Sequence, residues 1–402
     1  MEILKFITAG SVDDGKSTLI GRLLYETGNI PKDEFNFISS KYLTANGQPD
    51  FSRFTDGLAD ERAKGITIDV AYRYFFTTNR KYVIADSPGH KEFTRNMFTA
   101  ASNADLAIIL VDGLCGVTEQ TKRHSYIVDF LGIKQLIYAV NKMDLLNYQE
   151  NEFISIQSDL LALSNELNSS PVVIPISALN GENLVVKSHK MNWYAGPTLL
   201  TCLENSNPKT ATGNAAALWV QHASKVDNKW IAMGKVLQGS FSLGNVVKLP
   251  GDVPVNILSA WKAGSFCESL LAQEAASLKL ESEVSIERGD LLVNGNLDIR
   301  WEDRIKVRCC YFSENPARIH SVFWIKVAGM VVKGEISSIK KRLAIETGIL
   351  EENVESIELN DFVWLELQLD SPILYSLGSI PELSRGILID PSSNFTAAAF
   401  LV

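Results

Sequence analysis

The sequence predicts an α/β fold, in which an N-terminal domain with a doubly wound, mostly parallel sheet is followed by small antiparallel β-barrels. Three observations support this prediction. Apolar runs of strand type alternate with helix-type segments along the first half of the chain. The first of these runs leads directly into a glycine-rich loop. Beyond about residue 208, the apolar runs are short and alternating and are broken by Gly, Pro, Asn and Asp, which is typical of small barrels.

Length and composition limit the class of protein. The chain has 402 residues, of which 46% are hydrophobic and 21% charged, as in a globular protein of about two to four domains. Its net charge of −9 argues against broad binding to nucleic acid or anionic membranes. The five cysteines lack C-x-x-C spacing, so we expect neither a zinc site nor a disulfide framework. With no visible signal peptide and no apolar run of about 18 residues, we expect a cytoplasmic protein without a membrane span.

The glycine-rich loop is Gly10-Ser11-Val12-Asp13-Asp14-Gly15-Lys16-Ser17-Thr18, which fits the pattern G-x-x-x-x-G-K-[ST]. It lies between a strand-type run, Ile3–Thr8, and a segment that can continue as a helix, Leu19–Leu24. Its glycines allow backbone N–H groups to turn toward an anion, and the start of the helix adds positive potential. Lys16 brings a charge to the β- and γ-phosphates, and the Ser17 hydroxyl is a hard ligand for Mg²⁺. The loop therefore predicts a nucleotide-phosphate site.

Residues 25 to about 65 lack steady periodicity, so we expect a long functional loop there. Strands are predicted next over Val70–Phe75 and Lys81–Ala85, and the second leads into Asp86-Ser87-Pro88-Gly89-His90. In a phosphate-loop protein, Asp86 would reach Mg²⁺ through a water and the Gly89 N–H would bond the γ-phosphate. His90 would lie beside the attacking water. Such a turn is usually structural when it occurs alone, but its place downstream of a phosphate loop favours function.

Two later segments predict recognition of a base. Leu106–Asp112 and Gln135–Val140 are continuous apolar runs of the buried parallel type, and the second ends in Asn141-Lys142-Met143-Asp144. The Asp144 carboxylate can accept hydrogen bonds from the N1–H and N2–H₂ groups of guanine, a donor pair that adenine lacks. Asn141 can bond the N7/O6 side, and the Lys142 stem can cover the base.

The remaining elements continue the alternation. Helices are predicted over Lys91–Ser102, Glu119–Leu131 and Ile154–Glu166. We expect His124, in the second of these, to lie on the surface. A strand over Pro171–Ile176 leads into Ser177-Ala178-Leu179, where the Ala178 N–H could meet the guanine O6. The four motifs, each directly after a predicted strand, together indicate a GTPase with its ligand at the carboxyl edge of the sheet.

Three of these segments resemble the translation-factor class of GTPases: Gly65-Ile66-Thr67-Ile68, Asp86-x-Pro88-Gly89-His90 and Asn141-Lys142-Met143-Asp144. The resemblance implies that Thr67 completes the Mg²⁺ site and senses the γ-phosphate. It also implies that His90 orients the hydrolytic water, and that Val12 and Ile66 form an apolar gate. The implied catalytic residues are His90, Lys16 and Thr67, and the implied metal ligands are Ser17, Thr67 and Asp86.

Finer details point to one family within the class. Asp13-Asp14 stands where elongation factor Tu and its relatives usually carry Asp-His. Four segments look like the GTPase (large) subunit of assimilatory ATP sulfurylase: Asp69–Phe75, Thr94–Met97, Arg123–Ser125 and Met191–Leu200. Later segments look like the hairpins of two successive barrels: Trp230–Val236, Gly239–Asn245, Glu287–Leu292, Arg385–Asp390 and Thr396–Val402. The resemblance implies three domains, over residues 1–207, 208–296 and 297–402.

The family implies a function for the whole chain. GTP hydrolysis with Mg²⁺ would be coupled to formation of adenylyl sulfate and pyrophosphate from ATP and sulfate. The adenylyl-transfer site would lie on a partner, a small catalytic adenylyltransferase subunit of the CysD type, in a heterodimer or larger complex. Neither nucleic acid nor a membrane is an expected partner.

Some residues depart from the family pattern. They are Lys64, Ser87 and the strand Ala215–Val220, so a specialised paralogue with a related partner stays open. Two hypotheses from different functional classes also stay open. The chain could be a translation-type factor, or a scaffold that holds GTP without turnover.

Several conspicuous residues are interpreted as structural. The vicinal pair Cys309-Cys310 lies in an alternating strand pattern and is expected to pack in a core. The basic run Lys340-Lys341-Arg342 is interpreted as a solvated face. His222 and His320 lie among strand residues without candidate metal partners.

Overall fold

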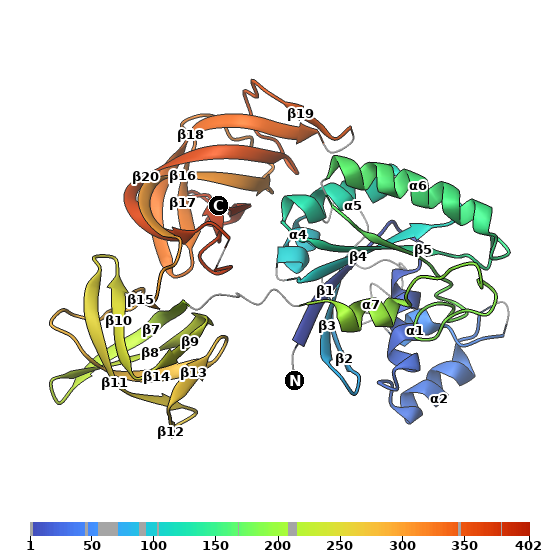
Figure 1. The fold of residues 1–402 in the computed structure, drawn as a ribbon. Helices are drawn as coiled ribbons and strands as arrows, with labels where there is room; N and C mark the ends of the chain where they lie inside the picture. Colours follow the sequence, from blue (N-terminus) through green and yellow to red (C-terminus); the bar gives the residue numbers. More distant parts are fainter. Residues whose placement is uncertain are drawn as a thin grey trace. The chain divides into compact units, whose positions relative to one another are not determined.

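The computed structural model describes residues 3–44, 47–54, 71–87, 94–102, 104–167, 169–207, 215–344, 347–378 and 380–402. The chain forms two compact units (Figure 1). One comprises Met1–Lys209 with Ala344–Ile349, and the other Thr210–Leu343 with Leu350–Val402. No helix in these described ranges is long and apolar enough to cross a membrane.

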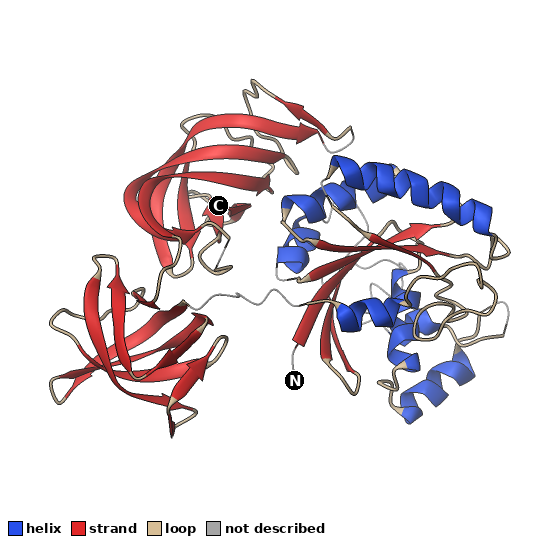
Figure 2. Ribbon diagram, viewed as in Figure 1, coloured by secondary structure: helices blue, strands red, loops and turns tan. Residues whose placement is uncertain are grey.

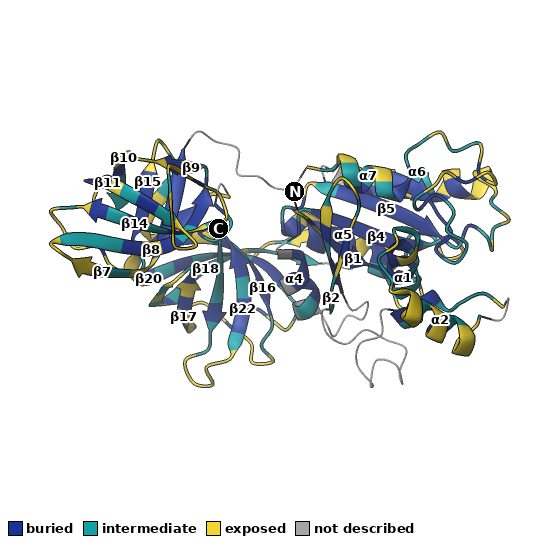
Figure 3. Cartoon of the chain, turned by 90° about the horizontal axis from the view of Figure 1, so that it is seen from below, coloured by how far each residue is buried: buried dark blue, intermediate teal, exposed yellow. Residues whose placement is uncertain are grey.

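The first unit contains a six-stranded sheet whose strand order is β2-β3-β1-β4-β5-β6. In that order the strands are Ala71–Phe76, Lys81–Asp86, Ile3–Ala9, Leu106–Asp112, Gln135–Asn141 and Val172–Pro175. Only β2 runs antiparallel to its neighbour, and the other described pairings are parallel. The central strands β4 and β5 are buried along nearly their whole length, because helices cover both faces (Figure 3). The predicted mostly parallel sheet is confirmed.

Helices lie on both faces of this sheet, as Figure 2 shows in blue. Those described are α1 (Lys16–Glu26), α2 (Lys32–Lys41), α4 (Thr94–Ser102), α5 (Glu119–Phe130), α6 (Glu150–Glu166) and α7 (Leu199–Asn205). Apolar residues of α1 and α7 share one core cluster with the strands, whereas α5 and α6 cover the opposite face. Helix α5 begins at a capped turn, in which the Thr118 hydroxyl accepts the Thr121 N–H. The doubly wound arrangement is thereby confirmed.

The prediction of a long loop after α1 is partly wrong. Helix α2 and a 3₁₀ turn, η1 (Phe51–Phe54), lie within it, joined by described turn and coil residues, and residues 55–70 are outside the described residues. Ile38 is the buried residue described for α2, so this helix presents no apolar stripe that periodicity could detect. This insertion of α2 and η1, residues 32–54, is held by packed aromatic rings instead, with Tyr25 stacked on Phe35 at 4.6 Å and Phe51 tilted against Tyr25 at 5.3 Å.

The expected exposure of His124 is also wrong. Its side chain is buried, with only 3% of its surface exposed. Helix α5 carries a continuous run of buried residues from His124 to Val128, so its buried face is wider than the pattern of polar residues in the sequence suggests. A polar residue in a short helix does not by itself report which face it lies on.

The second unit contains two antiparallel β-barrels. The first closes as β10-β15-β7-β8-β14-β11, because β10 also pairs with β11. Its strands are β7 (Ala216–Val226), β8 (Lys229–Gln238), β10 (Gly244–Leu249), β11 (Val253–Lys262), β14 (Ala275–Glu281) and β15 (Leu291–Asn294). Three short strands accompany the ring: β9 (Ser240–Ser242), β12 (Ser265–Cys267) and β13 (Ser269–Leu271).

The second barrel closes as β17-β21-β22-β16-β20-β18 through an additional β17–β18 pairing. Its strands are β16 (Ile299–Tyr311), β17 (Val322–Val327), β18 (Met330–Ala344), β20 (Phe362–Ser376), β21 (Arg385–Ile389) and β22 (Thr396–Leu401), with β19 (Ile349–Glu351) beside β18. Cys309 and Cys310 are both fully buried in β16, which confirms the packing interpretation. Each barrel has its own apolar core, so the predicted fold class is confirmed.

Candidate functional site

The glycine-rich loop joins the end of β1 to the start of α1. Asp13 and Gly15 both have positive φ angles, of 68° and 93°. The Lys16 ammonium is buried inside the turn and donates to the carbonyl oxygens of Gly10 and Ser11, at 2.9 and 2.7 Å. Burial lowers the pKa of Lys16, and Asp86, Asp14 and Asp13 oppose this effect. The loop thus holds a cation directed at its own backbone oxygens, which phosphate oxygens could replace.

Two carboxylates border this loop. Asp14 is buried, and its Oδ2 accepts the backbone N–H of Ser11 at 2.5 Å. Burial raises the pKa of Asp14, against the lowering effects of the Ser11 N–H and of Lys16. Asp86, at the end of β3, accepts the Thr8 hydroxyl on Oδ1 at 3.0 Å. Thr8 therefore fixes Asp86 at the same sheet edge as the loop.

Asn141, the last residue of β5, connects two motifs. Its Nδ2 donates to the Asp14 carbonyl at 2.7 Å, and its Oδ1 accepts the Ala178 N–H at 2.9 Å. These bonds use groups that were predicted to meet the base, and the direct base contacts of Asn141 and Ala178 stay predictions. In the structure, Asn141 braces the phosphate loop against the 177–179 segment.

Asp144 is oriented by the segment that follows β6. The Ser177 hydroxyl donates to Asp144 Oδ1 at 2.6 Å and accepts the Asn180 N–H at 3.2 Å. Lys142 has a positive φ of 65°, and its ammonium pairs with Asp112 Oδ2 at 2.7 Å. The carboxylate of Asp144 and the stem of Lys142 are therefore both held by partners before any base arrives.

The predicted site residues separate into two groups. Thr67, Pro88, Gly89 and His90, together with Ile66 of the implied gate, lie outside the described residues. The others lie at or just after the ends of β1, β3, β5 and β6, whose carboxyl ends share one edge of the sheet. They are Gly10, Ser11, Val12, Asp13, Asp14, Gly15, Lys16, Ser17, Thr18, Asp86, Ser87, Asn141, Lys142, Met143, Asp144, Ser177, Ala178 and Leu179.

Three contributors were missed by sequence analysis: Thr8, Asp112 and Arg22. Asp112 had a detectable signal, because it ends a continuous buried strand in the same way as Asp86 and Asn141. Thr8 and Arg22 had none. Their partners, Asp86 and the carbonyls of Leu179 and Asn180, lie far away in the sequence.

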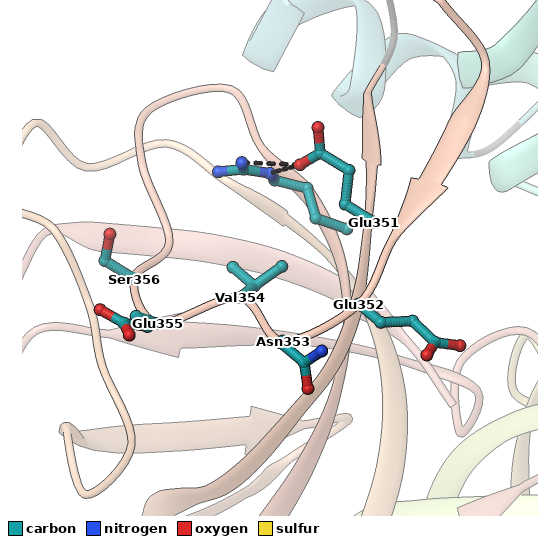
Figure 4. Close-up of a pocket in the computed structure, with 7 residues that line it drawn as sticks. Glu351, Glu352, Asn353, Val354, Glu355 and Ser356 are labelled. Carbon is teal, nitrogen blue, oxygen red and sulfur yellow. Dashed lines mark hydrogen bonds and ion pairs between the residues drawn. The ribbon is translucent and has the colours of Figure 1, made fainter.

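A separate hollow of about 400 Å³ lies on the second barrel. Its lining includes Glu351, Glu352 and Glu355, and the guanidinium of Arg342 is bound to Glu351 at 2.7 Å (Figure 4). Arg342 also contacts Asp361, at 3.3 Å. Carboxylates would repel a phosphate group, and the cation is already neutralised, so this hollow does not suit a nucleotide.

The two other residues of the basic run are engaged as well. Lys340 pairs with Glu366 at 3.2 Å, and the Lys341 ammonium lies 4.5 Å from the centre of the Trp364 ring. Each cation of the run therefore has an acidic or aromatic neighbour on the barrel surface, in agreement with its interpretation as a solvated face.

Comparison with known proteins identifies the class and then the family. The family model "Elongation factor Tu GTP binding domain" matches residues 1–233. The fold and the site residues thus define a GTPase of the translation-factor class, whose domain binds GTP. The chain is 40% identical to sulfate adenylyltransferase subunit 1 of Tolumonas auensis, across 100% of this chain and 86% of that protein. The same protein of Citrobacter koseri is 38% identical, with 100% and 86% covered. The chain belongs to the sulfate adenylyltransferase subunit 1 family.

Two further similarities were found, one to a curated relative and one to a solved structure. The bifunctional enzyme CysN/CysC of Xylella fastidiosa is 39% identical, across 99% of this chain and 65% of that enzyme. Among solved structures, the Ski7 GTPase-like domain of S. cerevisiae bound to GTP superposes with a TM-score of 0.54 at 16% identity. That comparison covers 99% of this chain and 96% of the other, and it supports the fold alone.

Proposed function

We propose that this chain is the GTPase subunit of a sulfate adenylyltransferase. It hydrolyses GTP and couples this reaction to the formation of adenylyl sulfate and pyrophosphate from ATP and sulfate, in sulfate assimilation. The observation that carries the proposal is the similarity along the whole chain to proteins named sulfate adenylyltransferase subunit 1. Adenylyl sulfate formation is strongly uphill, which gives a reason to couple it to GTP hydrolysis.

The phosphate site consists of the glycine-rich loop and Lys16. When GTP binds, we expect the Lys16 ammonium to exchange the carbonyls of Gly10 and Ser11 for β- and γ-phosphate oxygens. Asp144 takes the guanine donors. His90 orients the water that attacks the γ-phosphorus, and Thr67 senses whether the γ-phosphate is present.

The donor set suits a magnesium ion. Ser17 is the second residue of α1, and Asp86 is close enough to Lys16 to oppose the lowering of its pKa by burial, so hydroxyl and carboxylate oxygens border the same loop. We propose Ser17, Thr67 and Asp86 as its ligands, the last through a water. Bound Mg²⁺ would supply charge neutralisation on the β- and γ-phosphates.

The name "subunit 1" implies a partner subunit in a complex. We propose that this partner is a small catalytic adenylyltransferase subunit that carries the adenylyl-transfer site, in a heterodimer or larger cytoplasmic complex. This chain alone would then hydrolyse GTP without making adenylyl sulfate.

The test is co-purification of the chain with its native partner, followed by a pyrophosphate-release assay with ATP and sulfate. We expect GTP to stimulate release, and the matched complex with Lys16→Ala to lose the stimulation. GTP turnover without any stimulation, in the presence of the small subunit, would overturn the sulfate assignment in favour of a specialised paralogue. Co-purification of ribosomes or tRNA in place of an adenylyltransferase would favour a translation-type factor.

A further inference from the structure

Arg22, near the middle of α1, joins three parts of the first unit. Its Nη1 donates to the Leu179 carbonyl at 3.1 Å and its Nη2 to the Asn180 carbonyl at 3.2 Å. Its Nε pairs with Glu26 Oε1 at 2.7 Å, one turn further along the same helix. The side chain is mostly buried, with 18% of its surface exposed. Nη1, Nη2 and Nε each have a defined partner, so the guanidinium is held in one orientation.

The other side of the guanidinium faces the insertion. The Phe51 ring centre lies 4.7 Å from Arg22 Cζ, within the range of a cation–π contact. The neighbouring Gly21 has no room for a side chain, because a Cβ there would collide with the Phe51 backbone. Helix α1 is therefore pressed against η1 at the point from which Arg22 reaches the 177–181 loop.

The loop is closely fitted to this arrangement. Gly181 has a φ of +78°, and a Cβ at this position would collide with the Glu26 carboxylate and lie 2.7 Å from Arg22 Nη2. The backbone conformation favours glycine here, and a side chain at this position would displace the head groups of Glu26 and Arg22. The Arg22–Glu26 pair thus forms the surface against which the 177–181 loop packs.

A chain of hydrogen bonds leads from Arg22 to the carboxylate of Asp144, which is proposed to recognise the base. Asn180, whose carbonyl is held by Arg22, donates its N–H to the Ser177 hydroxyl at 3.2 Å. That hydroxyl in turn donates to Asp144 Oδ1 at 2.6 Å. The Asn180 side chain is also anchored, on the Tyr148 hydroxyl at 3.1 Å. The Ser177 hydroxyl bonds to Oδ1 of Asp144. The position of Ser177 therefore fixes this oxygen and, with it, the orientation of the carboxylate plane, or its tilt.

We propose that Arg22 is a positioning residue for guanine selectivity: it seats the 177–181 loop so that Ser177 holds Asp144 in the orientation that accepts two base donors. The inference rests on the proposed guanine site and adds a residue that is not among the predicted nucleotide and metal ligands. A carboxylate held at the correct tilt accepts both the N1–H and the N2–H₂ groups of guanine. A carboxylate that is free to turn keeps one bond at a time.

The readout is the ratio of affinities for GDP and IDP, because hypoxanthine keeps N1–H and lacks the amino group. In the wild-type full-length chain we expect a clear preference for GDP. In Arg22→Met, which keeps the apolar stem and removes the donors, we expect this preference to fall about tenfold, as for loss of one hydrogen bond to a charged group. Arg22→Lys keeps the charge without the fork, so its preference should fall between the two.

The matched control is Arg53→Met. Arg53 lies in the same insertion, pairs with Asp50 at 3.4 Å and is positioned over the Tyr42 ring at 5.3 Å. It should leave the GDP-to-IDP ratio unchanged. Ser177→Ala should reproduce the effect of Arg22→Met, and the double variant should add little to either.

The possible outcomes are distinct. Equal losses of GDP and IDP affinity in Arg22→Met, or no loss, overturn the positioning role and leave the guanine site standing. If Arg22→Met does not fold, the ratios in Arg22→Lys and Ser177→Ala decide in the same way. A wild-type chain that binds ADP as tightly as GDP overturns the proposed function itself, and the inference with it.

Discussion

Gly15 shows how a missing side chain fixes the phosphate loop. Its φ is +93°, and a Cβ there would lie 2.5 Å from Asn141 Nδ2, the atom that holds the Asp14 carbonyl. Substitution would push the brace away from the loop. We expect Gly15→Ala to lower GDP affinity by at least about tenfold, or about 1.4 kcal/mol, because the displaced Asn141 side chain no longer holds the Asp14 carbonyl.

Gly28→Ala is the matched control. Gly28 has a similar φ of +73°, but no atom of the described residues lies within 4 Å of a Cβ built there. It should carry the backbone cost without a loss of affinity, as measured by titration with a fluorescent GDP. Equal affinity losses in both variants would show that strain alone, and not the Asn141 contact, matters.

His124 is a buried histidine whose charge state affects stability. Burial, with Lys16 and Arg123 nearby, lowers its pKa from 6.5 to about 3, and its Nδ1 has no hydrogen-bond partner among the described residues. Between these pKa values the unfolded chain binds a proton that the folded chain does not. The contribution of His124 to the unfolding free energy is therefore complete above pH 6.5 and decreases as the pH falls toward 3.

From pH 7 to pH 5 we expect His124 to reduce the unfolding free energy by about 2 kcal/mol. His124→Gln does not titrate, so its stability should fall by that much less over the same range. Thermal unfolding of the wild-type and variant chains at several pH values measures the difference. Parallel pH curves for the two chains would contradict the pKa shift.

At the scale of elements, the insertion of α2 and η1 depends on aromatic packing. Phe51 has 2% of its surface exposed and contacts the rings of Tyr25 and Phe54 as well as the Arg22 guanidinium. We expect Phe51→Ala to destabilise this element by about 3–5 kcal/mol. Hydrogen exchange should then accelerate in the amides of α2, while those of the central strands β4 and β5 stay protected.

Phe37→Ala, in α2, provides the control within the same insertion. Phe37 is 54% exposed, so its removal should change stability by no more than about 0.5 kcal/mol. Faster exchange throughout the sheet in Phe51→Ala would show that the insertion is part of the global folding unit and not a separate element.

At the scale of the whole molecule, an apolar cluster joins the two barrels within the second unit. Trp219 and Leu291 of the first barrel share it with Leu374, Ile380 and Leu383 of the second. Lys235 and Glu382 add an ion pair at 3.0 Å. We propose domain limits at residues 1–207, 208–296 and 297–402, and expect the two barrels to unfold together because of this cluster.

Leu383→Ala tests that expectation. Leu383 is fully buried, so its truncation should lower the stability of the barrel unit by about 2–5 kcal/mol. Leu377, which is 46% exposed, is the matched site, and Leu377→Ala should have little effect. Denaturant unfolding followed by Trp fluorescence should show one barrel transition, shifted only by the first variant. Two separate barrel transitions would contradict cooperative unfolding.

The sequence by itself determined the fold class, the order of the motifs and the family. Strand ends could be predicted because buried parallel strands are continuous apolar runs. The strand Leu106–Asp112, for example, was predicted with the same bounds that the structure has. The phosphate loop and Asp144 were found for a related reason. Their chemistry is carried by adjacent residues, so a local pattern is enough to identify it.

The tertiary structure decided how the motifs are connected. Asn141 joins Asp14 to Ala178, and Arg22 reaches a carbonyl 157 positions away. The burial of His124 and the existence of α2 were likewise set by neighbours outside the local sequence. The physical reason is that periodicity reports only which residues of one element share a face. Which distant segment covers that face, and which side chain braces it, is decided when the chain packs.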